Sequence, residues 1–425
     1  MNRTLRGAAV ATAASAMLVL AGCSGASDPA SSGSPAANDG PVTLTYWDFI
    51  DPSQDNARSI ALRENVAAFE AANENIKIDL QVVSLGDMLN RLPQAAAAGQ
   101  TPDVFKMFTP VVGQMAAAGA YSPITDVVAD VTDWLRPVDG FSDPDGEIVA
   151  VPFEYRTCVL YYNEKILAEV GAEVPTTYAE MIDAAGKAAD AGYTGFGSGF
   201  SDTDNSAIIG TWFDCFMSQV GQELWDENGE AVFASEKGEE FGEILAGLRD
   251  AGAFSSSVVS DNYGNVADGL VNGTIAMAVL GTERIGGFAT SAPDVKWTSL
   301  PAASVGDTMG TTMGWTLGIG ASTKNFDASW KFIEYMTGAE AAARMATGGE
   351  VPTRASSYDG EFFSTPEADV VNTIADYVSE NSNPRVYADN WTGLAKGLST
   401  SGQSLIVNGI SGAEFIANAQ AAANQ

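Results

Sequence analysis

The ionisable residues of this chain limit the chemistry that it can perform. Its 425 residues include no histidine, three cysteines, and 54 aspartates and glutamates against 21 lysines and arginines. Without an imidazole there is no Ser-His-Asp or Cys-His nucleophile system and no His-ligated zinc site. The formal charge of −33 repels phosphate backbones, so no nucleic-acid partner is expected. Two classes of function are still compatible with the composition, namely catalysis by carboxylates and binding without catalysis.

The N-terminal residues have the pattern of an exported lipoprotein. Arg3 and Arg6 precede an uncharged stretch rich in Ala, Leu and Val, which predicts a signal peptide over residues 1–22. Leu20-Ala-Gly-Cys23 resembles the lipobox of bacterial lipoproteins, which implies cleavage before Cys23 and lipidation of its sulfur. Residues 23–40 hold no large apolar side chain after the cysteine and predict a flexible tether. The alternative is a chance cysteine after an ordinary signal peptide.

Two further cysteines lie in the body of the chain. If Cys23 is lipidated, Cys158 and Cys215 form an even pair in an exported protein, which makes a disulfide a candidate. Two buried free thiols are the alternative, because the sequence does not show whether their Cα atoms approach to about 6 Å.

Strand and helix patterns alternate along the rest of the chain. Strand patterns occupy residues 42–47, 76–83, 103–108, 159–162, 274–280, 297–300 and 315–319. Helical patterns occupy residues 58–72, 87–98, 111–118, 178–191, 206–220, 238–251, 328–336, 339–345, 370–379, 392–400 and 413–423. This alternation predicts an α/β protein with helix-covered sheets, divided into two lobes.

A series of short motifs identifies a family resemblance. The motifs are Leu44-Thr-Tyr-Trp47, Ala98-Gly-Gln-Thr-Pro-Asp103, Ala118-Gly-Ala-Tyr-Ser-Pro-Ile-Thr125, Val151-Pro-Phe153, Gly269-Leu-Val-Asn-Gly273, Gly314-Trp-Thr-Leu-Gly-Ile319, Ser329-Trp-Lys-Phe-Ile-Glu-Tyr-Met-Thr-Gly338 and Val351-Pro-Thr-Arg354. In this order they resemble the extracellular solute-binding proteins of ABC importers, in the carbohydrate-binding branch that includes maltose-binding protein. The resemblance implies a two-lobed, type II periplasmic-binding-protein-like fold, with crossing hinge segments and a ligand cleft between the lobes. It assigns residues 41–154 and 301–348 to lobe 1, and residues 155–300 and 349–425 to lobe 2.

Four candidate positions for ligand contacts follow from their places in this arrangement. A sugar site needs aromatic platforms and planar polar groups, because a sugar has apolar C–H faces and a rim of hydroxyls. Trp47 and Asp48 end the first predicted strand, where ligands of open α/β sheets bind. Trp315 begins a later strand, and Trp391 precedes a C-terminal helix. Each tryptophan could instead belong to the core, and Asp48 could cap the segment that follows it.

Five more candidates depend on the resemblance. Phe108 and Trp212 occupy positions where maltose-type relatives often carry an aromatic platform, although either could be core. Glu154 and Arg156 lie in a stretch that lines the hinge in relatives, as a polar clamp or an exposed ion pair. Glu283 stands where many relatives have the tryptophan of Gly-x-Trp. This departure argues against a maltodextrin site and for a hydrogen-bonding group.

The leading hypothesis is a lipid-anchored, extracytoplasmic and monomeric protein that captures a sugar and delivers it to ABC permease subunits. No catalytic residue, cofactor or metal ion is expected. A surface-anchored glycoside hydrolase is an alternative, because 54 carboxylates easily supply a catalytic pair. A third hypothesis is a binding protein for a polar or charged solute, such as a glycerophosphodiester or a polyol.

Overall fold

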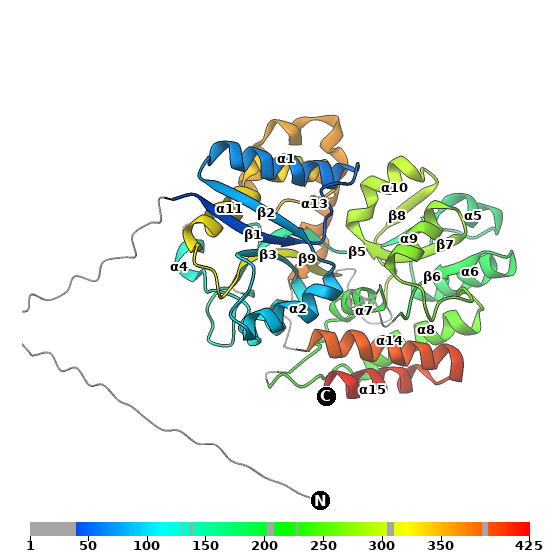
Figure 1. The fold of residues 1–425 in the computed structure, drawn as a ribbon. Helices are drawn as coiled ribbons and strands as arrows, with labels where there is room; N and C mark the ends of the chain where they lie inside the picture. The colour runs from blue at the N-terminus through cyan, green and yellow to red at the C-terminus, as the bar shows by residue number, and fades with distance from the viewer. Residues whose placement is uncertain are drawn as a thin grey trace, which may run out of the picture. The chain divides into compact units, whose positions relative to one another are not determined.

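The computed structural model describes residues 40–129, 131–136, 138, 140–201, 208–226, 228–303, 310–384 and 390–425. The predicted signal peptide, Cys23 and the predicted tether up to residue 39 lie outside the described residues. The expected fold class is confirmed, since the described strands form two separate sheets that are both flanked by helices (Figure 1).

The first sheet has the strand order β10-β9-β3-β1-β2, with β4 pairing with β9 as well. Its strands are β1 (Val42–Asp48), β2 (Ile76–Val82), β3 (Val104–Phe108), β4 (Ala150–Arg156), β9 (Gly310–Ile319) and β10 (Ser382–Pro384). Strand β1 pairs in parallel with β2 and β3, whereas β9 runs antiparallel to β3 and β4. Strands β1 and β3 therefore end at the same edge of the sheet, which brings the residues that follow them close together.

The second sheet has the order β6-β7-β5-β8. Its strands are β5 (Cys158–Asn163), β6 (Thr194–Gly197), β7 (Ile275–Gly281) and β8 (Val295–Thr298). Only Thr157 separates β4 from β5, so the chain passes from the first sheet to the second over one residue. It returns between β8 and β9. A further segment lies beside the first passage, where Val351 forms an isolated bridge with Tyr155.

Helices cover both sheets (Figure 1). Those of the first lobe are α1 (Ala57–Ala72), α2 (Leu85–Ala97), α3 (Val112–Ala117), α4 (Thr125–Val128), α11 (Phe326–Thr337) and α12 (Ala339–Ala346). Those of the second are α5 (Glu164–Glu169), α6 (Tyr178–Asp190), α7 (Ile208–Gln219), α8 (Glu236–Asp250), α9 (Tyr263–Val271) and α10 (Ile285–Ser291). Short 3₁₀ turns are η1 (Thr109–Val111), η2 (Thr282–Arg284), η3 (Ala355–Asp359), η4 (Glu361–Ser364) and η5 (Pro366–Ala368).

The C-terminal helices contact both lobes. They are α13 (Asp369–Asn381), α14 (Trp391–Asn408) and α15 (Gly412–Ala423). Helix α13 contacts β4 and β10 of the first sheet and α10 of the second lobe, while α14 and α15 pack together against α7 and α8. The resemblance assigns residues 155–300 and 349–425 to the second lobe, but Tyr155 and Arg156 end β4 of the first sheet, and β10 pairs with β9 of that sheet. A three-residue strand has too few residues to show a strand pattern in the sequence.

Strand β4 was not predicted, because Pro152 interrupts its pattern. Among the described strands β4 pairs with β9 alone, apart from the Tyr155–Val351 bridge, and its register shifts between Pro152 and Glu154. Both an edge position and a bulge tolerate proline, which cannot donate a backbone hydrogen bond. Opposite the bulge, Gly314 has a φ of +149°, and a Cβ atom there would lie 2.0 Å from the Glu154 carbonyl oxygen. The close approach of β4 to β9 therefore requires glycine at this position.

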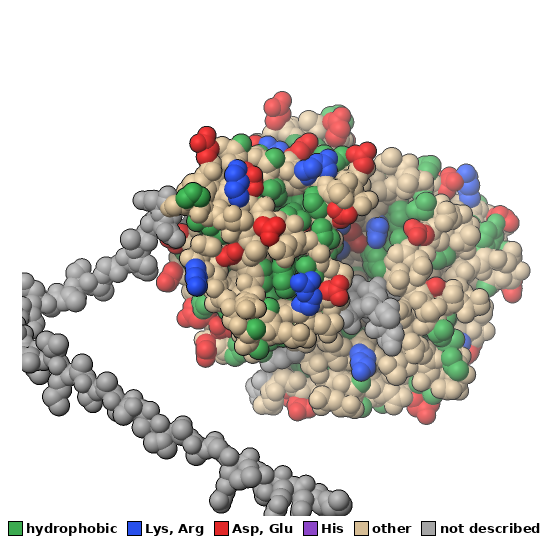
Figure 2. Space-filling model, viewed as in Figure 1, with side chains coloured by type: hydrophobic (Ala, Val, Ile, Leu, Met, Phe, Trp, Pro, Cys, Tyr) green, Lys and Arg blue, Asp and Glu red, His purple; other side chains and the backbone are tan. Residues whose placement is uncertain are grey.

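Acidic side chains are scattered over the face seen in Figure 2 and do not gather in one patch. No described helix is both long enough and apolar enough to cross a bilayer.

Candidate ligand-binding site

A cleft of about 970 Å³ lies between the two lobes. Its wall includes Phe49, Arg58, Phe108 and Trp315 from the first lobe, with Thr211, Tyr263, Glu283 and much of α10 from the second. Phe49 follows β1 and Phe108 ends β3, so this wall stands at the carboxyl ends of parallel strands, where ligands of open α/β sheets bind. The volume suits a small molecule, since such sites hold roughly 300–1,000 Å³.

Three aromatic side chains from different strands meet in the wall of the first lobe. The rings of Phe49 and Trp315 stack with their centroids 4.0 Å apart and their planes at 29°. Phe108 lies opposite Trp315 in the pairing of β3 with β9, with its ring centroid 5.6 Å from that of the indole. We call the stacked pair of Phe49 and Trp315 the Phe49–Trp315 platform; sheet register places Phe108 beside it.

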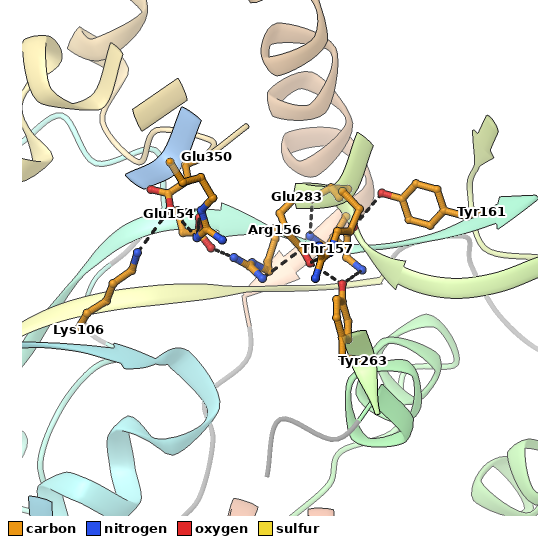
Figure 3. Close-up of polar contacts among 12 residues, drawn as sticks. Lys106, Glu154, Arg156, Thr157, Tyr161, Tyr263, Glu283 and Glu350 are labelled. Atoms are coloured by element: carbon orange, nitrogen blue, oxygen red, sulfur yellow. Dashed lines mark hydrogen bonds and ion pairs between the residues drawn. The ribbon is translucent and has the colours of Figure 1, made fainter. Parts of the chain in front are cut away.

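Charged side chains form a continuous chain of contacts beside the platform (Figure 3). Asn56 caps α1 by accepting the Ser59 amide hydrogen, which places Arg58 in the first helical turn. Arg58 donates from Nε and Nη2 to Glu350 Oε1, at 3.0 and 2.6 Å. Lys106 Nζ lies 3.5 Å from the same oxygen, and Arg58 Nη2 lies 3.8 Å from Glu154 Oε2.

The chain of contacts continues from the first lobe to the second. Arg156, the last residue of β4, pairs with Glu154 on one side and places Nη1 3.4 Å from Glu283 Oε2 on the other. The Tyr263 hydroxyl donates to Glu283 and accepts the Gly281 amide hydrogen at 2.9 Å. Arg284 Nε lies 3.9 Å from Glu283 Oε1. One ionic network thus joins both lobes at the back of the cleft.

Burial and neighbouring charges act in opposite directions on these groups. Burial raises the pKa of Glu350, but Lys106 and Arg58 outweigh it, so the pKa is lowered overall. Burial likewise raises the pKa of Glu283, and Arg156 and Arg284 outweigh it. Both carboxylates are therefore ionised at neutral pH. Burial lowers the pKa of Arg156 and raises that of Tyr263, which keeps the Tyr263 hydroxyl a neutral donor.

The structure brings four of the nine predicted contact residues to the cleft wall. These four are Phe108, Arg156, Glu283 and Trp315. Glu154 lies behind them, 1% exposed, and reaches the cleft only through Arg156 and Arg58. Glu154 and Arg156 form an ion pair, but it is not the exposed one given as the alternative to a polar clamp, since their side chains are 1% and 13% exposed.

Asp48 and Trp47 do not line the cleft, although they end the first strand as predicted. Asp48 is fully buried, and its carboxylate accepts hydrogen bonds from the Tyr46 hydroxyl at 2.5 Å and the Ile50 amide at 3.0 Å. The Trp47 indole donates to Gln81 Oε1 at 3.1 Å, and Arg91 lies 4.7 Å over its ring. Alternation along the strand turns Trp47 away from the face that carries its two neighbours.

Trp212 and Trp391 belong to the core. Trp212 is 1% exposed, with its ring centroid 4.8 Å from that of Phe196 and 5.0 Å from that of Phe241. Trp391 is fully buried and lies behind Phe108, with their centroids 6.3 Å apart. Helical spacing cannot show which of two buried faces borders a cleft, so the sequence did not separate these positions from contact positions.

Cys158 and Cys215 form a disulfide with their Cα atoms 6.2 Å apart. Cys158 begins β5 directly after the passage between the sheets, and Cys215 lies on α7. The bond therefore ties the first crossing to the helix whose Thr211 borders the cleft.

Several residues of the site were missed by sequence reasoning. Phe49 and Arg58 line the cleft, and Lys106 and Glu350 support its wall. Lys106 could have been found in the sequence, since one charged residue interrupts the apolar strand Val104-Phe-Lys-Met-Phe108.

Among the described residues, no cluster of acidic or cysteine side chains could hold a metal ion.

Two α/β lobes with a ligand-sized cleft and a shared ionic network at its back have the architecture of two-lobed binding proteins. The chain belongs to the bacterial extracellular solute-binding protein family, whose model matches residues 56–343. Members of this family are binding proteins that act outside the cytoplasm.

Individual relatives agree with this assignment. The diacetylchitobiose binding protein DasA of Streptomyces coelicolor is 28% identical over 171 residues, which cover 39% of each chain. The sn-glycerol-3-phosphate-binding periplasmic protein UgpB of Agrobacterium fabrum is 31% identical over 137 residues, or 28% of this chain and 31% of the relative. The matched regions thus span well under two thirds of these two relatives. The GacH receptor of Streptomyces glaucescens, solved unliganded and with acarbose, has a TM-score of 0.74 at 24% identity, covering 90% of this chain and 97% of the receptor.

Proposed function

We propose that this protein binds a neutral saccharide in the cleft and delivers it to the permease subunits of an ABC importer. The observation that carries the proposal is the Phe49–Trp315 platform beside fixed charged groups in one cleft. An aromatic ring complements the apolar face of a sugar, and ionised side chains complement its hydroxyls. Phe108, Arg156, Glu283 and Trp315 are the proposed contacts, with Glu154 supporting Arg156.

The charges of the cleft favour a neutral ligand. Its described lining holds three arginines and three carboxylates, namely Arg58, Arg156, Arg284, Asp268, Glu283 and Glu367. Arg58 and Arg156 already contact carboxylates in the network. An anionic ligand would have to compete with these ion pairs, whereas a hydroxyl can donate to a carboxylate without displacing its cation.

Glu283 does not suit the role of the acid in glycoside hydrolysis. A glycosidase needs one carboxylic acid whose raised pKa keeps it protonated near neutral pH. The pKa of Glu283 is lowered overall, because Arg156 and Arg284 outweigh its burial. Binding without turnover is therefore the proposed activity, and release of reducing ends from oligosaccharides by the purified protein would contradict it.

A thermal-shift panel tests the ligand class. The panel contains maltotriose, diacetylchitobiose, xylobiose, a polyol such as ribitol, and sn-glycerol 3-phosphate. A ligand at 100 times its Kd stabilises the folded state by about 2.7 kcal/mol, which is a measurable shift. A shift with a neutral saccharide is expected. If only sn-glycerol 3-phosphate shifts the transition, the neutral assignment is wrong.

Two tryptophan variants test whether the ligand binds in the cleft. W315A removes one of the two platform rings and should reduce the shift at the same ligand concentration by about half or more, because a tenfold weaker Kd leaves about 1.4 kcal/mol of stabilisation. W297A is the matched control, because Trp297 lies on β8 against Tyr377 and outside the lining of this cleft. It should keep the wild-type shift.

Lipid anchoring through Cys23 is also part of the proposal, supported by the lipobox resemblance and the export pattern before it. Fractionation of cells that express the full chain should find the wild type with membranes and C23A in the soluble fraction. Equal membrane association of both proteins would contradict the anchor.

A further inference from the structure

A lysine is fully buried beneath the platform. Lys106 lies in the middle of β3 and is 0% exposed. Its ammonium group lies 4.4 Å from the ring centroid of Phe153, 4.8 Å from that of Phe49 and 5.7 Å from that of Trp315. Both rings of the Phe49–Trp315 platform therefore rest against one buried cation, an arrangement that cation–π attraction favours.

One carboxylate joins this cation to the crossing segments. Glu350 precedes Val351, which bridges to Tyr155 beside the first passage between the sheets. Its Oε1 atom contacts Lys106 Nζ at 3.5 Å and Arg58 Nη2 at 2.6 Å, and its side chain is 2% exposed. Figure 3 shows Lys106 pointing toward Glu350 from the strand below. This contact connects β3, α1 and the segment after α12.

Neither partner touches the space that a ligand would fill, since Lys106 and Glu350 are absent from the described lining of the cleft. A charged pair at this depth is costly to desolvate, and hydrophobic side chains of similar size would pack there without that cost. Simple packing therefore does not account for a lysine at this place. Its position between the platform and the crossing segment suggests a part in ligand binding.

We propose that Lys106 is a positioning residue, which acts with Glu350 to hold the Phe49–Trp315 platform in its ligand-binding arrangement and to link it to the segment after α12. The proposal rests on the proposed function, because it assigns the pair to that same cleft. It adds that ligand affinity depends on two buried charges that make no contact with the ligand.

Binding measurements on matched variants test the affinity. The variants are K106M, E350Q and K106M/E350Q, titrated calorimetrically with whichever of maltotriose, diacetylchitobiose or xylobiose gives the largest thermal shift. K106M should bind at least tenfold more weakly at a temperature where the variant is folded. The double variant should lose less binding free energy than the sum of the two single losses, because the residues act as a unit. K187M is the control, since Lys187 pairs with Asp183 on the exposed face of α6 and should bind normally.

A ligand-free measurement tests the positioning. The protein is labelled with 5-fluorotryptophan, and the ¹⁹F resonance of Trp315 is identified by its loss in W315F. K106M should shift that resonance, while K187M should not. If K106M does not fold, K106M/E350Q replaces it in both experiments, because it leaves no unpaired lysine or glutamate at this place.

The outcomes separate the two proposals. A shifted Trp315 resonance together with weakened binding supports the positioning role. Wild-type affinity or an unshifted resonance in the folded variant overturns it, even if the variant is less stable. If the wild type binds none of the saccharides, the proposed function fails, and the resonance alone decides whether Lys106 positions the platform.

Discussion

Arg156 and Glu283 belong to different lobes, and the 3.4 Å between Nη1 and Oε2 makes them a direct ionic contact between the lobes at the back of the cleft. Arg156 ends the last strand before the chain enters the second sheet, and Glu283 follows β7 of that sheet. Tyr263, the first residue of α9, and Arg284, the next residue of the same 3₁₀ turn, support Glu283. Two residues of the cleft wall thus join the first sheet to the second.

Neutralising Glu283 should weaken both binding and stability. Among the described residues, E283Q leaves Arg156 with Glu154 as its one contacting carboxylate, and breaking a buried ion pair by removing one partner costs about 3–5 kcal/mol. Urea denaturation should show this loss, and calorimetry should show weaker binding of the saccharide from the panel. E164Q is the control, because Glu164 pairs with Lys296 at an exposed position. Unchanged binding by E283Q would show that Glu283 does not contribute to ligand binding.

Acid should destabilise the protein through the network. The pKa of Glu350 and that of Glu283 are lower in the folded state than their ordinary value. Their stabilisation is therefore complete above the unfolded-state pKa of about 4.3, and it is lost as the pH falls through the folded-state values. Urea unfolding between pH 3 and 7 should give a steep fall in stability below pH 5, and E350Q should reduce the slope. An equal slope in E350Q and wild type would contradict the assignment.

Removing the disulfide should reduce stability without removing the site. C158A/C215A opens a link between residues 57 positions apart, which typically costs about 2–4 kcal/mol. The expected result is a lower urea midpoint, with saccharide binding retained below the transition because neither cysteine lines the cleft. Wild-type protein unfolded with and without dithiothreitol provides the comparison. Identical midpoints with and without the bond would show that it does not stabilise the fold.

The two tryptophans Trp212 and Trp315 should respond differently to truncation. W212A leaves a cavity in the aromatic core of the second lobe, which costs about 3–5 kcal/mol, but the folded fraction should bind normally. W315A should lower affinity at least tenfold, equivalent to about 1.4 kcal/mol. Calorimetry below each melting transition separates the effects. Normal binding by W315A would show that the Phe49–Trp315 platform does not contribute to ligand binding.

The sequence predicted the class of fold well, because the order of strands and helices follows from local periodicity. Phe108 and Trp315, two of the predicted contact residues, line the cleft because the end of β3 pairs with the middle of β9. Lys106 and Glu350 were not found. Their contact joins positions 244 residues apart, and no local pattern pairs a lysine in a strand with a glutamate after a helix.

Burial could not be predicted for the aromatic candidates. Trp212 and Trp315 have the same chemistry, and both occur in apolar segments. Only the tertiary packing shows that Trp212 meets Phe196 and Phe241, while Trp315 stacks on Phe49 at the cleft. Contact residues that come together by packing between distant segments can be identified only from the three-dimensional structure.

The strand order of the first sheet has a consequence for synthesis. Strand β9 stands between β3 and β4, and its Thr316 bonds to Met107, which precedes it by 209 positions. During synthesis from the N-terminus, residues 158–298 are available to form the second sheet before β9 has been made. Strands β3 and β4 cannot pair with β9 until that later segment is complete. Distant pairings form slowly, because a long loop must first be closed. The lobe that is encoded second should therefore be the first to complete its sheet.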